Sequence, residues 1–181
     1  NNMKILGELK LPGVSDYLHP ITDTLKLGIG RMTELTQYGA TISVGLKITL
    51  FDVTNEENPI DVSTFELKGA FSEIAYNHKS LIPLKSRQIY ALPIYNWYDY
   101  QSTQGMYVMW IDVENKEIVV LGSIIHQNLD KVGQDEWSYF YNRIVDKGVI
   151  IGDKIYSISN EFITVNELKD KLPLIETIKI S

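Results

Sequence analysis

The chain has 181 residues, 44% hydrophobic and 22% charged, so it is long enough to bury a core and its composition is not that of a disordered chain. Its net charge is −6 without a cluster of Lys and Arg, which argues against nucleic acid as a partner, because phosphate binding requires a concentrated positive patch. It has no cysteine, which excludes disulfides, thiol nucleophiles and Cys-based metal sites, and no apolar run approaches the ~20 residues of a membrane span.

Short strands separated by polar turns are predicted along the whole chain. The first strand covers residues 3–11, and three units of four strands follow at residues 17–68, 76–125 and 141–180. The strands of the first unit are expected at residues 17–22, 25–32, 41–53 and 60–68, those of the second at 78–84, 87–95, 106–113 and 117–125, and those of the third at 142–151, 154–159, 161–166 and 174–180. Helical spacing of apolar residues is rare, and residues 166–171 are expected to form a short connector.

A repeated segment links the first two units. Gly45–Val53 and Gly105–Val113 both start with Gly, continue as a strand and end in Asp-Val, with the same spacing between Gly and Asp in each copy. A strand repeat of this kind is typical of the blades of a β-propeller or of a related β-array. We therefore predict an all-β fold in a single domain over residues 1–181: a propeller segment of about three four-stranded antiparallel blades plus one extra amino-terminal strand.

The predicted propeller is incomplete. Residues 3–11 resemble the fourth strand of each unit but have no first three strands of their own, so we expect them to be the outer strand of a preceding blade. Propellers contain about 4–8 blades, and three blades alone would expose the flanks of the two end blades. The sequence therefore predicts that these blades meet further blades, either in a longer chain or by self-association.

Blocks of sequence in a fixed order resemble a known family. They are Gly13–Ile21, Leu27–Gly30, Gly45–Val53 with Asn58 and Pro59, Phe71–Lys79, Tyr139–Val145 and Gly152–Asn160. Over nearly its whole length the chain resembles the prokaryotic secreted proteins with a carboxy-terminal β-propeller domain distantly related to WD-repeats. It departs from them at Asn77, where Asp is typical, and at residues 67–70, where an acidic and glycine-rich stretch is typical. The resemblance implies the fold and a secreted or cell-surface location, although residues 1–4 show no signal peptide. It implies no reaction.

Each unit carries a Tyr two positions before a basic side chain near its first strand. The pairs are Tyr17 and His19, Tyr76 and His78, and Tyr141 and Arg143. Residues two apart on a strand share one face, and the first strand lies nearest the propeller axis. One interpretation is a ring of imidazoles at the channel mouth that binds a metal or transfers protons, and the other is a repeated hydrogen bond that ties each inter-blade loop to its blade. Arg143 favours the structural interpretation, because a guanidinium stays protonated and is not a usual metal ligand.

The remaining polar residues are predicted to be structural or solvated. Asp52 and Asp112 end the third strands of their units, where Asp commonly caps the following turn, so we do not expect a glycosidase pair. His126 follows a fourth strand in a polar loop and is expected to be solvated. The acidic turn at residues 55–58 lacks the spacing of a calcium loop. We predict no catalytic residue, metal or cofactor, although a triad that converges only in space would leave no signature in the sequence.

Three long connections are predicted on one face of the propeller, at residues 33–40, 96–104 and 126–137. They carry the aromatic residues Tyr38, Trp97, Tyr98, Tyr100 and Trp137. Aromatic side chains on exposed loops favour ligand binding, since they offer a large contact area at low entropic cost. The alternative is that these rings fold back over the blade tops as packing.

The residues favour a non-catalytic module that binds or scaffolds proteins or glycans, and the resemblance implies that it acts outside the cell. The alternative is a hydrolase of glycans or peptides with its site at the channel mouth, which would need carboxylates or a Ser-based triad to converge there.

Overall fold

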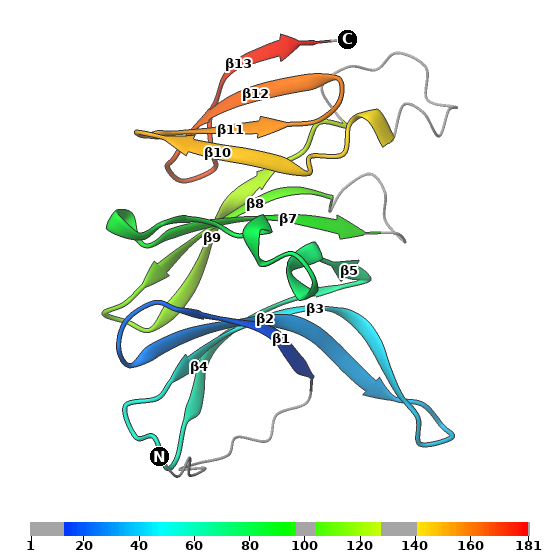
Figure 1. Ribbon diagram of the computed structural model, residues 1–181, viewed down its shortest axis with the longest axis vertical. Helices are drawn as coiled ribbons and strands as arrows, with labels where there is room; N and C mark the ends of the chain where they lie inside the picture. The colour runs from blue at the N-terminus through cyan, green and yellow to red at the C-terminus, as the bar shows by residue number, and fades with distance from the viewer. Residues whose placement is uncertain (1–12, 97–103, 128–140, 181) are drawn as a thin grey trace.

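The computed structural model describes residues 13–96, 104–127 and 141–180, and these residues form three antiparallel sheets stacked one above another (Figure 1). The expected all-β fold of three four-stranded antiparallel blades is confirmed. The expected amino-terminal strand at residues 3–11 lies outside the described residues.

Blade 1 is a meander of four strands in sequence order. The strands are β1 (Val14–Pro20), β2 (Leu25–Leu35), β3 (Thr41–Asp52) and β4 (Ile60–Lys68). Blade 3 has the same order, with β10 (Lys147–Ile151), β11 (Lys154–Ile158), β12 (Phe162–Glu167) and β13 (Leu174–Lys179). The connector between β12 and β13 contains turns and no helix.

Blade 2 differs from the other two blades in its inner strand. Its strands are β5 (Ala70–Phe71), β6 (Ile82–Leu84), β7 (Ile89–Asn96), β8 (Gly105–Asp112) and β9 (Glu117–Ile124). Both β5 and β6 pair antiparallel with β7, β5 at its end and β6 at its beginning, so together they form one interrupted strand. The interruption contains the 3-10 helices η1 (Glu73–Ala75) and η2 (His78–Ser80), and η3 (Lys85–Arg87) follows β6.

The strand expected from residue 78 therefore begins only at Ile82. The Ser80 hydroxyl donates a hydrogen bond to the Asn77 carbonyl at 2.8 Å and the Ser80 amide donates another at 3.0 Å, which closes a local turn instead of a sheet ladder. Likewise, the strand expected from residue 142 begins at Lys147, after a helical turn at residues 141–142.

Two apolar cores lie between the blades. The core between blades 1 and 2 includes Leu27, Ile29, Ile48 and Leu50 from blade 1 and Tyr90, Leu92, Ile94, Met109 and Ile111 from blade 2. The core between blades 2 and 3 includes Ile89, Ala91, Met106 and Val108 from blade 2 and Val145, Ile155, Leu168 and Leu172 from the blade 3 side. Because β7 and β8 belong to the middle blade and are covered on both faces, they are apolar at nearly every position.

The repeated glycines allow the third and fourth strands of blades 1 and 2 to approach closely. A Cβ on Gly45 would lie 2.5 Å from the Leu67 carbonyl oxygen, and a Cβ on Gly105 would lie 2.4 Å from the Ile124 carbonyl oxygen. Both obstacles are backbone atoms of the outer strand, which cannot move aside as a side chain can. Each copy of the repeat therefore begins with glycine because a side chain at that position would clash with the neighbouring strand.

Candidate functional site

The inner edge of blades 1 and 2 brings four rings together. Tyr17 and His19 project from β1, and the Tyr17 hydroxyl lies 3.0 Å from His19 Nδ1. The His78 ring, from η2 of blade 2, stacks on Tyr17 with ring centres 6.3 Å apart, and the His19 ring meets Tyr90 edge-on at 5.5 Å. The first predicted pair, Tyr17 and His19, therefore meets His78 of the second pair across the blade interface.

His19 is packed into this interface. The residue is 7% exposed, and its Nε2 is buried and has no hydrogen-bond partner among the described residues. Burial, and to a smaller degree the positive charge of Lys85, lowers the pKa of His19. The ring is therefore neutral at pH 7, and its free nitrogen does not face solvent.

The other predicted positions do not repeat this geometry. Tyr76 ends η1 and is 75% exposed, while Tyr141 is exposed before β10 begins. Arg143 is buried, donates from Nε to Glu161 Oε2 at 2.7 Å and from Nη2 to Oε1 at 3.1 Å, and lies 4.8 Å from the centre of the Phe162 ring. These residues do not form a ring on equivalent strands. In the part of the chain that the structure describes, no group of three or more His, Asp or Glu could hold a metal ion.

His126 is the residue for which the sequence interpretation is wrong. The sequence predicts a solvated ring, but His126 is fully buried between blades 2 and 3. Its Nδ1 lies 2.8 Å from the Ser159 hydroxyl and its Nε2 lies 2.9 Å from the Thr164 hydroxyl, so the loop after β9 is fastened to blade 3. Burial, and secondarily the Arg143 guanidinium, lowers the pKa of His126 to about 4. The apolar Ile124 and Ile125 before it are the one sequence sign that this segment is buried.

Asp52 and Asp112 cap turns, as predicted. Asp52 accepts the Thr54 amide at 2.8 Å, and Asp112 accepts the amides of Glu114 and Asn115 at 3.1 and 3.0 Å. Asp52 also accepts a hydrogen bond from Lys116 Nζ at 2.6 Å, which joins the β3 end of blade 1 to the β8–β9 turn of blade 2. The hydrogen bonds from Lys116 and Thr54 lower the pKa of Asp52 to about 2. Both carboxylates are thus committed to turns.

Of the three connections predicted on the loop face, the structure describes the whole of one, the β2–β3 turn. The Thr36 amide donates to the Ala40 carbonyl at 2.8 Å and the Gly39 amide donates to the Thr36 carbonyl at 2.9 Å, so the turn is closed by its own backbone. Tyr38 stands at its tip with 87% of its surface exposed. β7 ends on the same side of the stack (Figure 1). Trp97, Tyr98, Tyr100 and Trp137 lie outside the described residues.

Comparison with known proteins gives one family and two relatives. A family model described as a β-propeller domain matches residues 1–171. An uncharacterized protein of Methanocaldococcus jannaschii is 33% identical over 129 residues, which cover 71% of this chain and 19% of that protein. An uncharacterized protein of Archaeoglobus fulgidus is 35% identical over 92 residues, which cover 51% of this chain and 13% of that protein. The chain therefore matches only a small part of the length of these relatives. No solved structure matches it significantly.

Proposed function

The chain belongs to the β-propeller domain family, and from this premise we propose that it is a non-catalytic binding or scaffolding module that acts outside the cell. One contrast in the structure carries the proposal. Histidine and arginine side chains often act in catalysis, but here both are buried in structural contacts. His126 fastens blade 2 to blade 3, and Arg143 binds Glu161 within the blade 3 region. Tyr38, by comparison, presents nearly its whole surface to solvent on a closed turn.

The ligand is proposed to bind the face that carries the β2–β3 turn. Tyr38 is the described anchor on this face, and the sequence adds Trp97, Tyr98, Tyr100 and Trp137 to the same set of connections. Exposed aromatic side chains are common anchors in binding surfaces, because they bury a large area while losing little rotamer freedom. Protein and glycan surfaces are the two ligand classes that such anchors suit.

A glycan or peptide hydrolase with its site at the channel mouth is the alternative function, and no contact among the described residues favours it. A general base must come within hydrogen-bond reach of its substrate. His19 Nε2 is buried in the blade interface, and the Asp112 carboxylate accepts hydrogen bonds from its own turn. Within the described ranges, none of the helices has the length and apolar character of a membrane-spanning segment.

Location and assembly complete the proposal. A secreted or cell-surface location is supported by the resemblance of Gly13–Ile21 and Phe71–Lys79 to the secreted propeller proteins. Association with further blades, in a longer chain or a second copy, is supported by the number of blades described, since propellers contain about 4–8.

The test is a screen of the intact protein against immobilised cell-surface glycans and extracellular proteins, with turnover measured on glycan and peptide substrates in parallel. We expect binding in one panel, weakened in Tyr38→Ala and in the double variant Trp97→Ala/Tyr100→Ala. Binding that neither variant changes would overturn the proposed surface, and turnover in a purified sample would overturn the non-catalytic assignment.

A further inference from the structure

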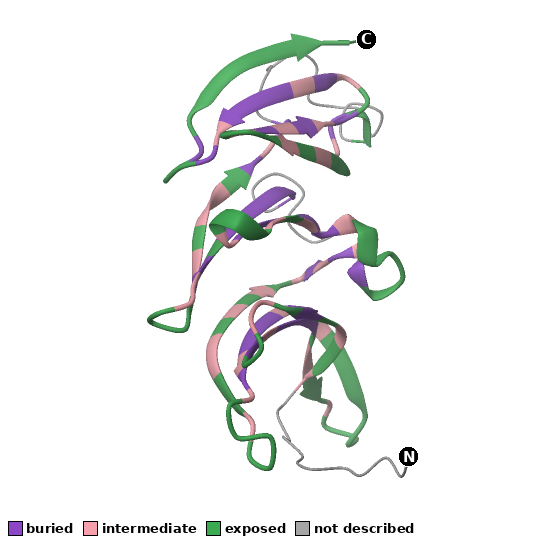
Figure 2. Cartoon of the chain, turned by 60° about the vertical axis from the view of Figure 1, so that its left-hand side comes forward, coloured by how far each residue is buried: buried purple, intermediate pink, exposed green. Residues whose placement is uncertain are grey.

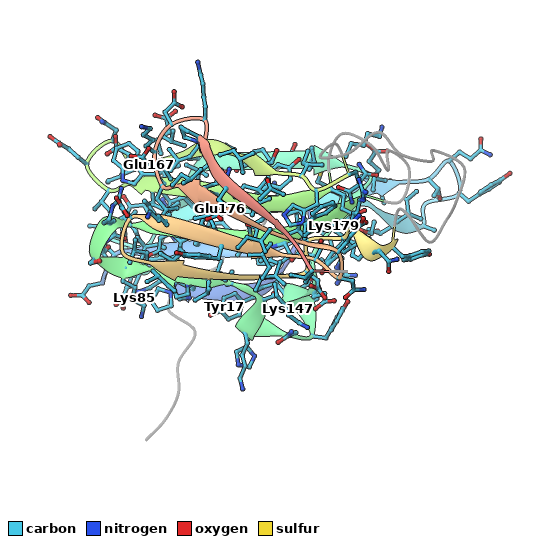
Figure 3. The ribbon with its side chains drawn as sticks, turned by 90° about the horizontal axis from the view of Figure 1, so that it is seen from above. Tyr17, Lys85, Lys147, Glu167, Glu176 and Lys179 are labelled. Carbon is cyan, nitrogen blue, oxygen red and sulfur yellow. The ribbon has the colours of Figure 1, made fainter. Side chains whose placement is uncertain are left out.

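The β2–β3 hairpin of blade 1 extends past the rest of its sheet. β1 pairs with β2 only as far as Arg31, and β4 pairs with β3 only as far as Gly45. The hairpin itself continues to the pair of Leu35 and Thr41. Residues 32–44, here called the arm, are therefore a two-stranded ribbon that projects from blade 1 beyond the strands of the other two blades (Figure 1). Figure 3, seen from above, shows the same ribbon reaching past the ends of the blade strands.

A β-bulge lies at the base of the arm. Met32 pairs with Gly45 and Thr33 pairs with Ser43, which leaves Val44 as the extra residue. The Gly69 amide donates a hydrogen bond to the Val44 carbonyl at 2.8 Å, so the base is fixed to the connection between β4 and β5. A bulge bends a strand and increases its twist, and it therefore turns the arm relative to the sheet of blade 1.

The arm exposes an apolar side chain on each of its two faces. Residues directly opposite each other in the ribbon share a face, and successive residues of a strand alternate between faces. Ile42 pairs with Glu34, the neighbour of Leu35. Leu35 and Ile42 therefore lie on opposite faces. Leu35 is 74% exposed, Ile42 is 47% exposed, and Tyr38 stands at the tip between them.

Little within the described part of the chain stabilises the arm. Residues 37–43 are all exposed (Figure 2), and beyond the base no other described strand pairs with the arm. A two-stranded ribbon alone is at best marginally stable in water, and exposed apolar side chains add an unfavourable contact with solvent. A second surface that encloses the arm would remove both disadvantages.

The charge on the arm indicates the chemistry of that second surface. Residues 32–44 contain one charged side chain, Glu34, and no Lys or Arg. Glu34 is exposed and shares its face with Ile42. A membrane surface is a poor match, because segments that lie on membranes bind anionic headgroups through Lys and Arg. A glycan is also a poor match, because Leu and Ile side chains offer no hydrogen bonds to sugar hydroxyls.

We propose that the arm inserts into an apolar groove of a partner protein, which contacts both faces of the arm and places a basic side chain against Glu34. The inference rests on the proposed function, because Tyr38 belongs to the proposed ligand-binding face, and it assigns that ligand to the protein class. Leu35 and Ile42 supply the apolar contacts, and the Tyr38 ring is the anchor at the tip. Protein interfaces are apolar at the centre and polar at the rim, which matches an uncharged tip with one charge nearer the base.

The test titrates each extracellular protein that binds in the screen against variants of the arm. Leu35→Ser and Ile42→Ser each remove one apolar contact, and Glu34→Lys reverses the charge. Ile60→Ser is the matched control, because Ile60 is 48% exposed and pairs with Asp52 at the opposite end of the blade. We expect the Kd to rise at least about tenfold in each arm variant and by less than about twofold in the control. Urea denaturation should show wild-type stability in all four variants, since the substituted positions are exposed.

Fluorescent labels test whether both faces of the arm are enclosed. The chain has no cysteine, so Leu35→Cys and Ile42→Cys each accept a single solvent-sensitive fluorophore. Adding the protein that binds should shift the emission of both labels to shorter wavelength. A shift at one position only would overturn the proposed contact with both faces.

Three other results would overturn the inference and name a different occupant. Binding to vesicles of phosphatidylcholine and phosphatidylserine that the arm variants abolish would assign the arm to a membrane. Self-association in sedimentation that the arm variants abolish would assign it to a second copy of the chain. Glycan binding that is weakened in Tyr38→Ala but unchanged in Leu35→Ser and Ile42→Ser would overturn this inference and leave the proposed function standing. If no panel binds, or if Tyr38→Ala also leaves binding unchanged, both proposals fail.

Discussion

His126 Nε2, just beyond the end of β9 in blade 2, lies 2.9 Å from the Thr164 hydroxyl on β12 of blade 3. Together with the Ser159 hydroxyl at 2.8 Å from Nδ1, this contact places a neutral imidazole in the interface between two blades. The stability of the interface between blades 2 and 3 therefore depends on the protonation state of His126.

The free energy of unfolding should fall as the pH is lowered from about 6.5 towards 4. The pKa of His126 is about 4 in the folded chain, whereas the ordinary pKa of a histidine, which applies to the unfolded chain, is 6.5. Between these two values the unfolded state binds more protons, so stability that depends on the neutral ring is complete above pH 6.5 and decreases by up to roughly 3 kcal/mol by pH 4. Urea denaturation at pH 7 and at several lower pH values down to pH 4 measures this fall in the free energy of unfolding.

The control for this prediction separates His126 from His19, whose pKa is also lowered by burial. His126→Leu should flatten the pH dependence more than His19→Leu does. It should also lower the free energy of unfolding at pH 7 by about 1–3 kcal/mol, because the buried hydroxyls of Ser159 and Thr164 each lose one hydrogen bond. An unchanged pH profile in His126→Leu would contradict the prediction.

Arg143→Leu should destabilise the chain by about 2–4 kcal/mol, since it leaves Glu161 without its two-pronged partner in a mostly buried site. Arg143→Lys should fall between wild type and Arg143→Leu, because an ammonium group cannot make both parallel hydrogen bonds. Urea denaturation at pH 7 gives the comparison. A fully stable Arg143→Leu variant would mean that this pair does not fix blade 3 and would reopen a functional role for the guanidinium.

The sequence predicts what depends on local pattern and misses what depends on contacts between blades. The repeat led by Gly45 and Gly105 identifies the first two blades, because the same close approach of the third and fourth strands occurs in both. The turn caps of Asp52 and Asp112 follow for the same reason. The burial of His126 is not predictable from local pattern, since its partners Ser159 and Thr164 lie 33 and 38 positions away in another blade. The split inner strand of blade 2 escapes prediction because a 3-10 turn has no apolar period of its own.

Gly45→Ala and Gly105→Ala should each destabilise the chain by about 1–3 kcal/mol, although exchanging Gly for Ala at a permissive position usually stabilises a protein slightly. The added methyl group would meet a backbone carbonyl oxygen at 2.4–2.5 Å and force the third and fourth strands apart. Thermal and urea denaturation measure the loss. Gly148→Ala is the matched control, because its Cβ would mainly meet the flexible ends of Met106 and Ile82, and it should cost less. Equal effects at the three positions would contradict this explanation of the repeated glycines.

Tyr38→Ala should leave the stability of the chain within about 0.5 kcal/mol of wild type while weakening ligand binding. The side chain is 87% exposed, and the turn that carries it is closed by hydrogen bonds from the Thr36 and Gly39 amides that do not involve the ring. If Tyr38 anchors the ligand, its removal should cost about 2 kcal/mol of binding free energy, close to thirtyfold in Kd. Tyr38→Phe, which keeps the ring, should retain most of the affinity. Denaturation curves and binding isotherms on the same samples separate the two effects, and a Tyr38→Ala variant that unfolds would show that the ring is packing and not an anchor.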